Sequence, residues 1–204
     1  MNDLNVAKSI YPNIKIRNFD ESKYNKINEN LKNKIPSANG SYSKFEVFSL
    51  SEYDGIVFLD SDILVLRDLE YLFHLDCDFG ACRELLIDQF NSGVMVINKR
   101  FLIPDYIDKL IYVTERGGPK EHADQDVIND FFRPFITEIP IYYNFLKTYY
   151  NYPFLQKYPM PEHIKTLHYI INKPWIQKTG MRQIEIATEE LDKLWWNVYN
   201  SIKK

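Results

Sequence analysis

The sequence predicts an α/β domain with a mixed, mostly parallel central sheet flanked by helices, and three observations lead to this class. Apolar runs of strand length, at residues 55–59 and 92–98, alternate along the chain with segments of helical periodicity, such as residues 102–116. Polar residues follow the apolar runs, as in layered α/β sheets whose ligands gather beyond the strand ends. The chain has 204 residues, 45% of them hydrophobic, which fits a single domain over residues 1–204 with a sizeable core.

The first part of the chain has the weakest pattern. Residues 6–11 are typical of the end of a helix that Pro12 stops, and residues 14–17 alternate enough for a short strand. Residues 20–40 are polar and rich in Asn and Lys, which predicts a loop with a weak helix. Residues 43–50 have roughly helical apolar spacing, so we expect a helical segment there.

The later elements follow from periodicity and from the turn residues between them. The predicted strands lie at residues 55–59, 79–81, 92–98, 136–141 and 166–170. The predicted helical segments lie at residues 68–73, 102–116, 124–132 and 189–202. The last helix carries Trp195 and Trp196, and an exposed face with these side chains leaves an oligomer interface open.

Charge and composition exclude several classes of function. The formal net charge is −3, and without an evident basic patch this argues against a protein that binds nucleic acid. No apolar stretch has the length of a transmembrane segment, and residues 1–11 lack the basic-then-apolar order of a secretion signal. Cys77 and Cys82 make no disulfide framework, so we expect buried thiols, a reducing compartment and a cytoplasmic location.

The apolar run at residues 56–66 contains two acids, Asp60 and Asp62, that a buried core does not need. In an extended segment, side chains two positions apart point the same way, so the end of a strand would aim both carboxylates at one point. Hard oxygen ligands of this kind suit Mg²⁺ or Mn²⁺, which commonly hold the phosphates of a substrate. A solvated turn after the strand explains the same residues, because Asp and Ser both favour turns.

A histidine and a lysine in the C-terminal third are further candidates. His168 lies in a strand-like run, and Lys173 begins the sequence Lys-Pro-Trp five residues later. The imidazole would serve as another metal ligand, and the lysine would neutralise a departing diphosphate. Taken alone, the histidine is more often part of a hydrogen-bonded structure, and the lysine is ordinarily a surface charge.

Two polar motifs lie next to the predicted strand and helix in the middle of the chain. Gly93 would permit close backbone approach to a ligand, and Asn91 offers a donor and an acceptor to sugar hydroxyls. Asp124 and Gln125 open a helix, where they would hold a hydroxylated substrate near a reacting carbon. Turn chemistry explains the first pair almost as well, and helix capping is the simpler role of Asp124.

Aromatic residues are plentiful, with 15 Tyr and 13 Phe, and they crowd between residues 131 and 158. Packing in the core is the expected role of such a segment. A surface that stacks on sugar rings is the alternative, because a flat apolar ring face matches a pyranose.

The motifs occur in one order along the chain. They are Lys44, Asp60-Ser61-Asp62, residues 90–98, Asp124-Gln125 with Asn129, residues 143–147 and residues 168–175. In identity, order and approximate separation they closely resemble the glycogenin-type family of retaining glycosyltransferases, in the branch of glycogenin and plant glucuronosyltransferases. The resemblance covers residues 43–175.

This resemblance implies a GT-A fold and transfer of a sugar from a UDP-sugar donor to a glycan or protein acceptor. It also implies Mn²⁺ as the cofactor, with Mg²⁺ as the alternative. The implied metal ligands are Asp60, Asp62 and His168; the implied donor-binding residues are Lys44, Ser61, Gly93 and Lys173; the implied catalytic residues are Asn91, Asp124 and Gln125. Retention in this family does not require a placed nucleophile, so we expect Gln125 to position the substrate.

Two departures from the family pattern suggest alternatives. We expect the family's first strand, which binds the nucleotide, to be missing ahead of residues 9–16, and Ile171 stands where the family usually has a glycine. A β-branched side chain there would crowd the diphosphate, so an inactive relative that binds glycan or a partner protein is the second hypothesis. A phosphatase of the haloacid dehalogenase type is a third, but that motif wants Thr or Val where this chain has Leu64.

Overall fold

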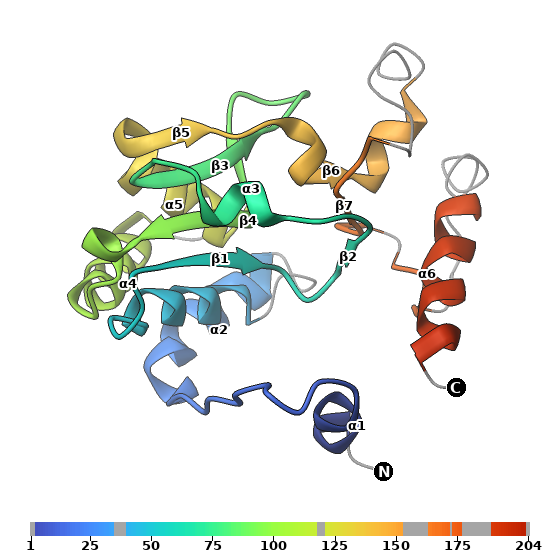
Figure 1. Cartoon of the computed structure of the whole chain (residues 1–204). Helices are drawn as coiled ribbons and strands as arrows, with labels where there is room; N and C mark the ends of the chain where they lie inside the picture. Colours follow the sequence, from blue (N-terminus) through green and yellow to red (C-terminus); the bar gives the residue numbers. More distant parts are fainter. Residues whose placement is uncertain are drawn as a thin grey trace.

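Seven short strands and six α-helices make up the described part of the chain (Figure 1). The computed structural model describes residues 3–34, 40–117, 121–152, 163–171, 173–176 and 189–202. The strands are β1 (Gly55–Leu59), β2 (Ile63–Val65), β3 (Phe79–Arg83), β4 (Phe90–Asn98), β5 (Ile136–Glu138), β6 (Phe145–Leu146) and β7 (Thr166–His168). The α-helices are α1 (Asp3–Ile10), α2 (Asn25–Lys34), α3 (Glu70–Phe73), α4 (Asp105–Gly117), α5 (Asp124–Phe132) and α6 (Glu189–Ile202). The 3-10 helices are η1 (Glu21–Tyr24), η3 (Ser41–Ser49), η4 (Lys99–Phe101), η5 (Arg133–Phe135), η6 (Ile141–Tyr143) and η7 (Lys147–Asn151).

The strands form two sheets, one of four strands in the order β1-β4-β3-β5 and one of three in the order β2-β7-β6. Three pairings in the described residues are antiparallel (β1 with β4, β3 with β4, β2 with β7), and two are parallel (β3 with β5, β6 with β7). The expected α/β fold with mixed sheets is confirmed, but the expectation that the sheet is mostly parallel is wrong. The link between β3 and β4 is too short for the crossover that a parallel pair requires.

The strand β4 is the centre of the larger sheet, and all of its residues except the last are buried. Met95 and Ile97 pack into a core with η3, α4 and α5, whereas Val94 and Val96 pack on the other face with Leu72 of α3. This division follows from the alternation of side chains along a strand. Cover on both faces therefore explains why the run is apolar without a break.

Aromatic rings fill the core under the larger sheet. The Phe132 ring stacks on Phe79 with 5.0 Å between ring centroids and on Phe48 with 5.1 Å. Tyr143, Phe145 and other rings of the same aromatic-rich segment are also buried. The expected core role holds for these residues, while residues 153–158 lie outside the described part of the chain.

The smaller sheet has its own core, against which α6 packs. Tyr169 donates a hydrogen bond from its hydroxyl to the Leu191 carbonyl at 2.6 Å, and its ring lies 5.1 Å from that of Trp195. The buried Lys147 ammonium pairs with the Asp192 carboxylate at 2.5 Å. Trp195 is thus half-buried and packs against this core, whereas Trp196 is 39% exposed.

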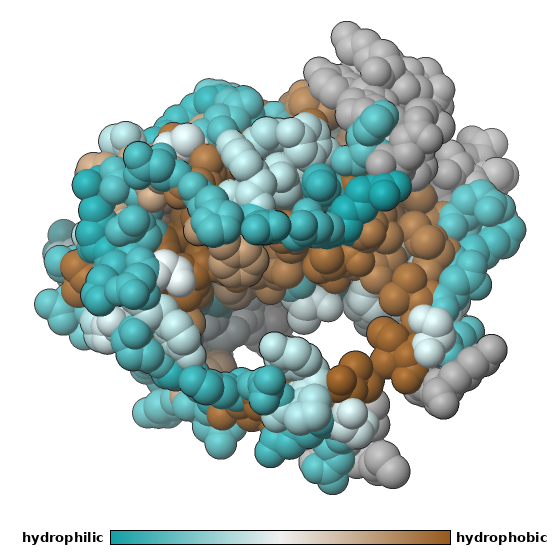
Figure 2. Space-filling view, viewed as in Figure 1, coloured by the Kyte–Doolittle hydropathy of each residue, from teal (hydrophilic) through white to brown (hydrophobic). Residues whose placement is uncertain are grey.

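One face of the molecule has a hydrophobic band. Figure 2 shows brown residues gathered across the middle of this face, over β1 and β2 and towards α6, with hydrophilic residues above and below. In β1, the residues from Ile56 to Leu59 are only half-buried. No helix in the described ranges is long and apolar enough to span a membrane.

Several predicted elements differ from the structure. Residues 14–17 form no strand, and residues 41–49 form a 3-10 helix. The weak helix expected within residues 20–40 is present as the ten-residue helix α2. Neither β2 nor β6 was predicted as a separate strand, because two or three residues are too few for a period to show. Cys77 and Cys82 are free and buried, as expected.

Candidate active site

Two adjoining cavities lie where β1 ends, and they share Lys44, Asp60, Asp62 and Asp124 in their walls. The first has a volume of about 550 Å³, and Ser61 and Lys173 also line it. The second has a volume of about 380 Å³ and is lined in addition by Asn91, Gln125 and Ile171. The structure thus brings most of the predicted site residues to one place.

Asp60 and Asp62 lie in the turn that connects β1 of the larger sheet to β2 of the smaller one. The Asp60 amide donates to the Gly93 carbonyl of β4 at 2.8 Å, and the Asp62 carbonyl accepts from the Tyr169 amide at 3.0 Å. β1 ends at Leu59, the predicted bound, and both acids lie beyond it in a turn, the alternative that the sequence left open. Backbone bonds to both sheets, rather than strand alternation, hold the turn in place.

His168 brings an imidazole to the same two carboxylates. It ends β7, where it lies opposite Ile63 of β2, and only 3% of the residue is exposed. Its Nε2 is 3.2 Å from Asp62 Oδ1 and 3.8 Å from Asp60 Oδ2. One ligand atom from each of the three residues lies within 4.8 Å of the others, which fits a single cation.

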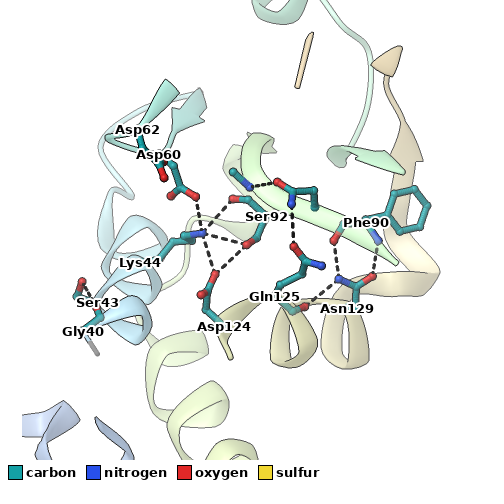
Figure 3. A network of polar contacts seen from close by, with 12 residues as sticks. Gly40, Ser43, Lys44, Asp60, Asp62, Phe90, Ser92, Asp124, Gln125 and Asn129 are labelled. Carbon is teal, nitrogen blue, oxygen red and sulfur yellow. Dashed lines mark hydrogen bonds and ion pairs between the residues drawn. The ribbon is translucent and has the colours of Figure 1, made fainter. Parts of the chain in front are cut away.

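Lys44 is the centre of a second group of contacts, which Figure 3 shows. Its Nζ lies 2.8 Å from Asp124 Oδ2, 2.9 Å from Ser92 Oγ and 3.1 Å from Asp60 Oδ2. Burial by itself lowers the pKa of Lys44, but Asp124 and Asp60 outweigh it and raise the pKa above its ordinary value. Lys44 is therefore a charged, buried cation that links Asp60 to Asp124.

Asp124 does not cap its own helix. The residue before it, Ala123, is the N-cap of α5 and has no side-chain capping bond. The Asp124 Oδ2 atom instead accepts from Ser92 Oγ at 2.8 Å and pairs with Lys44. The capping role considered for Asp124 is thus wrong, and its carboxylate lines both cavities.

Side-chain amides form a neutral layer beside these charges. Asn91 Nδ2 donates to Gln125 Oε1 at 3.0 Å and to Glu84 Oε1 at 2.9 Å. Gln125 Nε2 donates to the same Glu84 oxygen at 3.0 Å and to Gln89 Oε1 at 2.9 Å. Because each amide is bonded at both ends, the orientation of Gln125 in the second cavity is fixed.

Asn129 occupies the helix position one turn after Gln125. Its Oδ1 accepts from the Phe90 amide at 2.8 Å, and its Nδ2 donates to the Phe90 carbonyl at 2.7 Å. These bonds join α5 to the start of β4 (Figure 3). They fix where the two elements meet.

Gly93 has a different neighbour from the one expected. A Cβ at this position would lie 2.2 Å from His168 Cε1 and 2.6 Å from His168 Nδ1. The close approach that glycine permits here is that of the imidazole, not that of a ligand.

The remaining predicted residues lie at the cavity edges. Lys173 pairs with Asp62 Oδ2, and Ser61 is exposed in the wall of the first cavity. Burial by itself raises the pKa of Asp62, but His168 and Lys173 outweigh it and hold the pKa far below its ordinary value. Burial raises the pKa of Asp60, although Lys44 and His168 oppose the shift. Asp62 is therefore the firmly ionised member of the pair.

Sequence reasoning did not single out Glu84, Gln89 or Asn144, which hydrogen-bond to predicted site residues. Glu84 directly follows β3, as Asp60 directly follows β1. A polar residue after a buried strand is therefore a signal that could have identified Glu84. Asn144 lay in the motif at 143–147 but had no role assigned to it.

Residues 1–179 match a family model described as Glycosyl transferase family 8. The UDP-glucuronate:xylan alpha-glucuronosyltransferase 1 of Arabidopsis thaliana is 30% identical over 181 residues, which cover 79% of this chain and 26% of that protein. Glycogenin of Neurospora crassa is 28% identical over 168 residues, which cover 81% of this chain and 24% of that protein. The chain thus spans about a quarter of the length of these relatives.

Solved structures match as well. The glycosyltransferase GlyE of Streptococcus pneumoniae superposes with a TM-score of 0.61 and 26% identity, over 80% of this chain and 48% of that one. The galactosyltransferase LgtC, in complex with donor and acceptor sugar analogs, gives a TM-score of 0.55 at 21% identity, over 93% of this chain and 89% of that one. The fold is thus the α/β fold of the GT-A type, as the motifs implied.

Proposed function

The chain belongs to glycosyl transferase family 8, and from this premise we propose that it transfers a sugar from a UDP-sugar to a glycan or protein acceptor with retention of configuration. The observation that carries the proposal is the convergence of Asp60, Asp62 and His168 beside a cavity that Lys44 and Lys173 also line.

The three residues fit a divalent cation of the Mn²⁺ or Mg²⁺ kind. Two carboxylates supply hard oxygen ligands and one imidazole supplies nitrogen, a mixed set that favours Mn²⁺ over Mg²⁺. A bound cation would supply positive charge that stabilises the departing diphosphate. Asp60, Asp62 and His168 are the residues that would hold it.

The two lysines have separate tasks in this proposal. Lys173 lies at the edge of the first cavity and pairs with Asp62, so its ammonium is within reach of a diphosphate held at the same acids. Lys44 is committed to Asp60, Asp124 and Ser92, so it orients Asp124 towards the donor sugar. In this proposal Lys173 binds the departing diphosphate, and Lys44 holds the side chains that surround it in their positions.

Gln125 and Asn91 are proposed to position the sugar. Their amides are fixed by Glu84 and by each other, and both line the second cavity. A preorganised dipole at the reacting carbon costs no reorganisation during the reaction. We assign no covalent intermediate to Gln125.

Titration calorimetry with UDP, with and without Mn²⁺, tests the donor site. We expect UDP to bind in the presence of Mn²⁺ and to bind much more weakly without it. A screen of UDP-sugars by UDP release then identifies the donor. UDP affinity that does not depend on the metal would contradict the proposal.

The position of Ile171 favours the second hypothesis, a relative that binds glycan or a partner protein without turnover. This side chain is 55% exposed and lines the second cavity, where the family usually has a glycine. Glycan binding on an array, together with no UDP release from any UDP-sugar, would support this alternative.

A further inference from the structure

Asn144 is a buried amide that lies behind the proposed metal ligands. It follows η6 and precedes β6, and 1% of the residue is exposed. Its Nδ2 donates to Asn91 Oδ1 at 2.7 Å, and its Oδ1 lies 2.9 Å from His168 Nδ1. It therefore connects the amide layer to the imidazole.

The backbone of Gly93 fixes the polarity of this connection. The Gly93 amide donates to Asn91 Oδ1 at 2.9 Å, and a backbone N–H is a donor only. The Asn91 carbonyl oxygen must therefore point at Gly93, which also sets Nδ2 towards Glu84 and Gln125. The orientation of a side-chain amide is assigned from its hydrogen-bond partners. Here one partner is a backbone N–H, which can only donate, so the orientation of the Asn91 amide is fixed.

The same polarity passes through Asn144 to the imidazole. Because the Asn91 oxygen is an acceptor, Asn144 must present its NH₂ group to it and its carbonyl oxygen to His168. A carbonyl oxygen accepts hydrogen bonds, so His168 Nδ1 carries the proton. In the neutral ring Nε2 then holds the free lone pair, 3.2 Å from Asp62 Oδ1.

Gly93 also fixes the place of the ring. A Cβ at this position would lie 2.2 Å from His168 Cε1, so the imidazole rests against the glycine backbone. A ring flip would turn a carbon atom towards the Asn144 oxygen and lose the bond at Nδ1. Position and protonation of the imidazole are thus both determined by neighbouring atoms.

We propose that Asn144 is a positioning residue that holds His168 in the tautomer whose Nε2 is free to coordinate a divalent cation. This inference rests on the metal site of the proposed function. Asn91 and the Gly93 amide fix the orientation of the Asn144 side chain. Asn144 in turn contacts His168, the proposed metal ligand.

The affinity for Mn²⁺ alone, measured by calorimetry on the full chain, tests this role in Asn144→Leu and Asn144→Asp. Residues that orient a metal-binding histidine typically contribute about 10- to 100-fold to metal affinity, so we expect a loss of this size in Asn144→Leu. Asn144→Asp keeps an acceptor oxygen for Nδ1, so we expect a smaller loss. Equal losses in both variants would overturn the proposal.

Asn129→Leu is the matched control. Asn129 is equally buried, with 3% exposed, but its amide bonds to the backbone of Phe90 and Gln125. We expect this variant to lose thermal stability, as Asn144→Leu does, while its Mn²⁺ affinity stays within about threefold of that of the unmodified chain, because the substituted side chain does not contact the proposed ligands. A loss of Mn²⁺ affinity in the control as large as in Asn144→Leu would contradict a specific role.

Nitrogen NMR of protein labelled at histidine gives a readout that a purely structural role would not move. The chain has four histidines, and the spectrum of His168→Gln identifies the signals of His168. In the neutral ring of the unmodified chain we expect Nδ1 to carry the proton, and in Asn144→Leu we expect a mixture of tautomers. The same tautomer in both proteins would overturn the proposal.

The two measurements separate the possible failures. If the unmodified chain does not bind Mn²⁺, the proposed metal site fails, and the NMR spectrum still decides whether Asn144 sets the tautomer. If it binds Mn²⁺ and Asn144→Leu binds equally well, the positioning role fails while the metal site stands.

Discussion

The larger and smaller sheets contribute different things to the site. The larger sheet is built on β4, whose apolar run is covered on both faces, and it supplies Ser92 and Gly93. The smaller sheet has strands of two or three residues, and it supplies His168. The comparison teaches that His168, a residue of the candidate site, lies on a short strand that is held by pairing with distant segments and by the core packed against α6.

The largest expected effect concerns the buried ion pair between η7 and α6, next to the smaller sheet. Lys147→Met leaves Asp192 without this partner, and removing one member of a buried ion pair typically costs about 3–5 kcal/mol. Hydrogen exchange should rise in β6, β7 and α6, while β1, β3 and β4 stay protected. Uniform exchange across both sheets would show that they unfold together.

Lys193→Met is the control for this loss, because the Lys193 side chain is 58% exposed and pairs with Glu190 on the surface of the same helix. We expect no measurable change in stability or in hydrogen exchange, because exposed ion pairs contribute little.

The second prediction concerns the turn between the sheets. Asp62→Ala removes an ionised carboxylate from the proposed metal site, and we expect UDP binding in the presence of Mn²⁺ to fall by at least about 100-fold. This is beyond the usual loss for residues that only support a metal ligand. Calorimetry measures the change. Asp76→Ala, at an exposed aspartate, serves as the control and should bind like the unmodified chain. A loss below tenfold would remove Asp62 from the metal site.

The third prediction concerns Tyr42 of η3, which is buried in the core of the larger sheet. The Tyr42 hydroxyl is buried and has no hydrogen-bond partner among the described residues, so Tyr42→Phe should raise the free energy of unfolding by about 1 kcal/mol. Chemical denaturation at neutral pH measures this. A loss of stability would mean that the hydroxyl has a partner.

The pH dependence of the same residue has a definite sign. Burial raises the pKa of Tyr42 from 10.0 to about 12, with Asp124 and Asp126 adding to the shift. The folded state therefore favours the neutral phenol. The contribution of this preference to the free energy of unfolding is fully present below pH 10 and is lost as the pH rises towards 12. We expect Tyr42→Phe to lose less stability than the unmodified chain over this interval.

The smallest effect is expected at Ile171. Replacing Ile171 by Gly should relieve crowding in the second cavity and raise UDP affinity about two- to threefold, an effect near 0.5 kcal/mol. Ile176→Gly is a close control, since the two side chains are 55% and 56% exposed. Equal UDP affinity in all three proteins would show that Ile171 does not limit donor binding.

Sequence reasoning identified several elements well because their signals are local. The strand Gly55–Leu59 and the helices Asp124–Phe132 and Glu189–Ile202 have the predicted bounds, since each is a periodic run between polar residues. The resemblance to the glycogenin-type family is also confirmed by the family match over residues 1–179. The strands β2 and β6 were missed, because pairing between distant segments, not local pattern, defines them.

Prediction of the site reached the chemically distinctive residues but not their neighbours. Asp60, Asp62 and His168 were grouped in advance, and the structure places them together. Gly93 was predicted to bind the donor and Asn144 had no role assigned, but both contact His168, and no local spacing reports contacts between such distant positions. Capping was the alternative for Asp124 because it starts a helix, and only its contacts with Ser92 and Lys44, which are distant in sequence, exclude that role.

The turn at residues 60–62 bonds at one end to β4 and at the other to the residue after β7. Inserting or deleting one residue there would shift both pairings at once, whereas Ser61, with its exposed side chain, can change in chemistry without moving either neighbour. We therefore expect a substitution at Ser61 to disturb the turn less than a change in its length. A redesign of this turn can therefore change the residue at position 61 but must keep the number of residues.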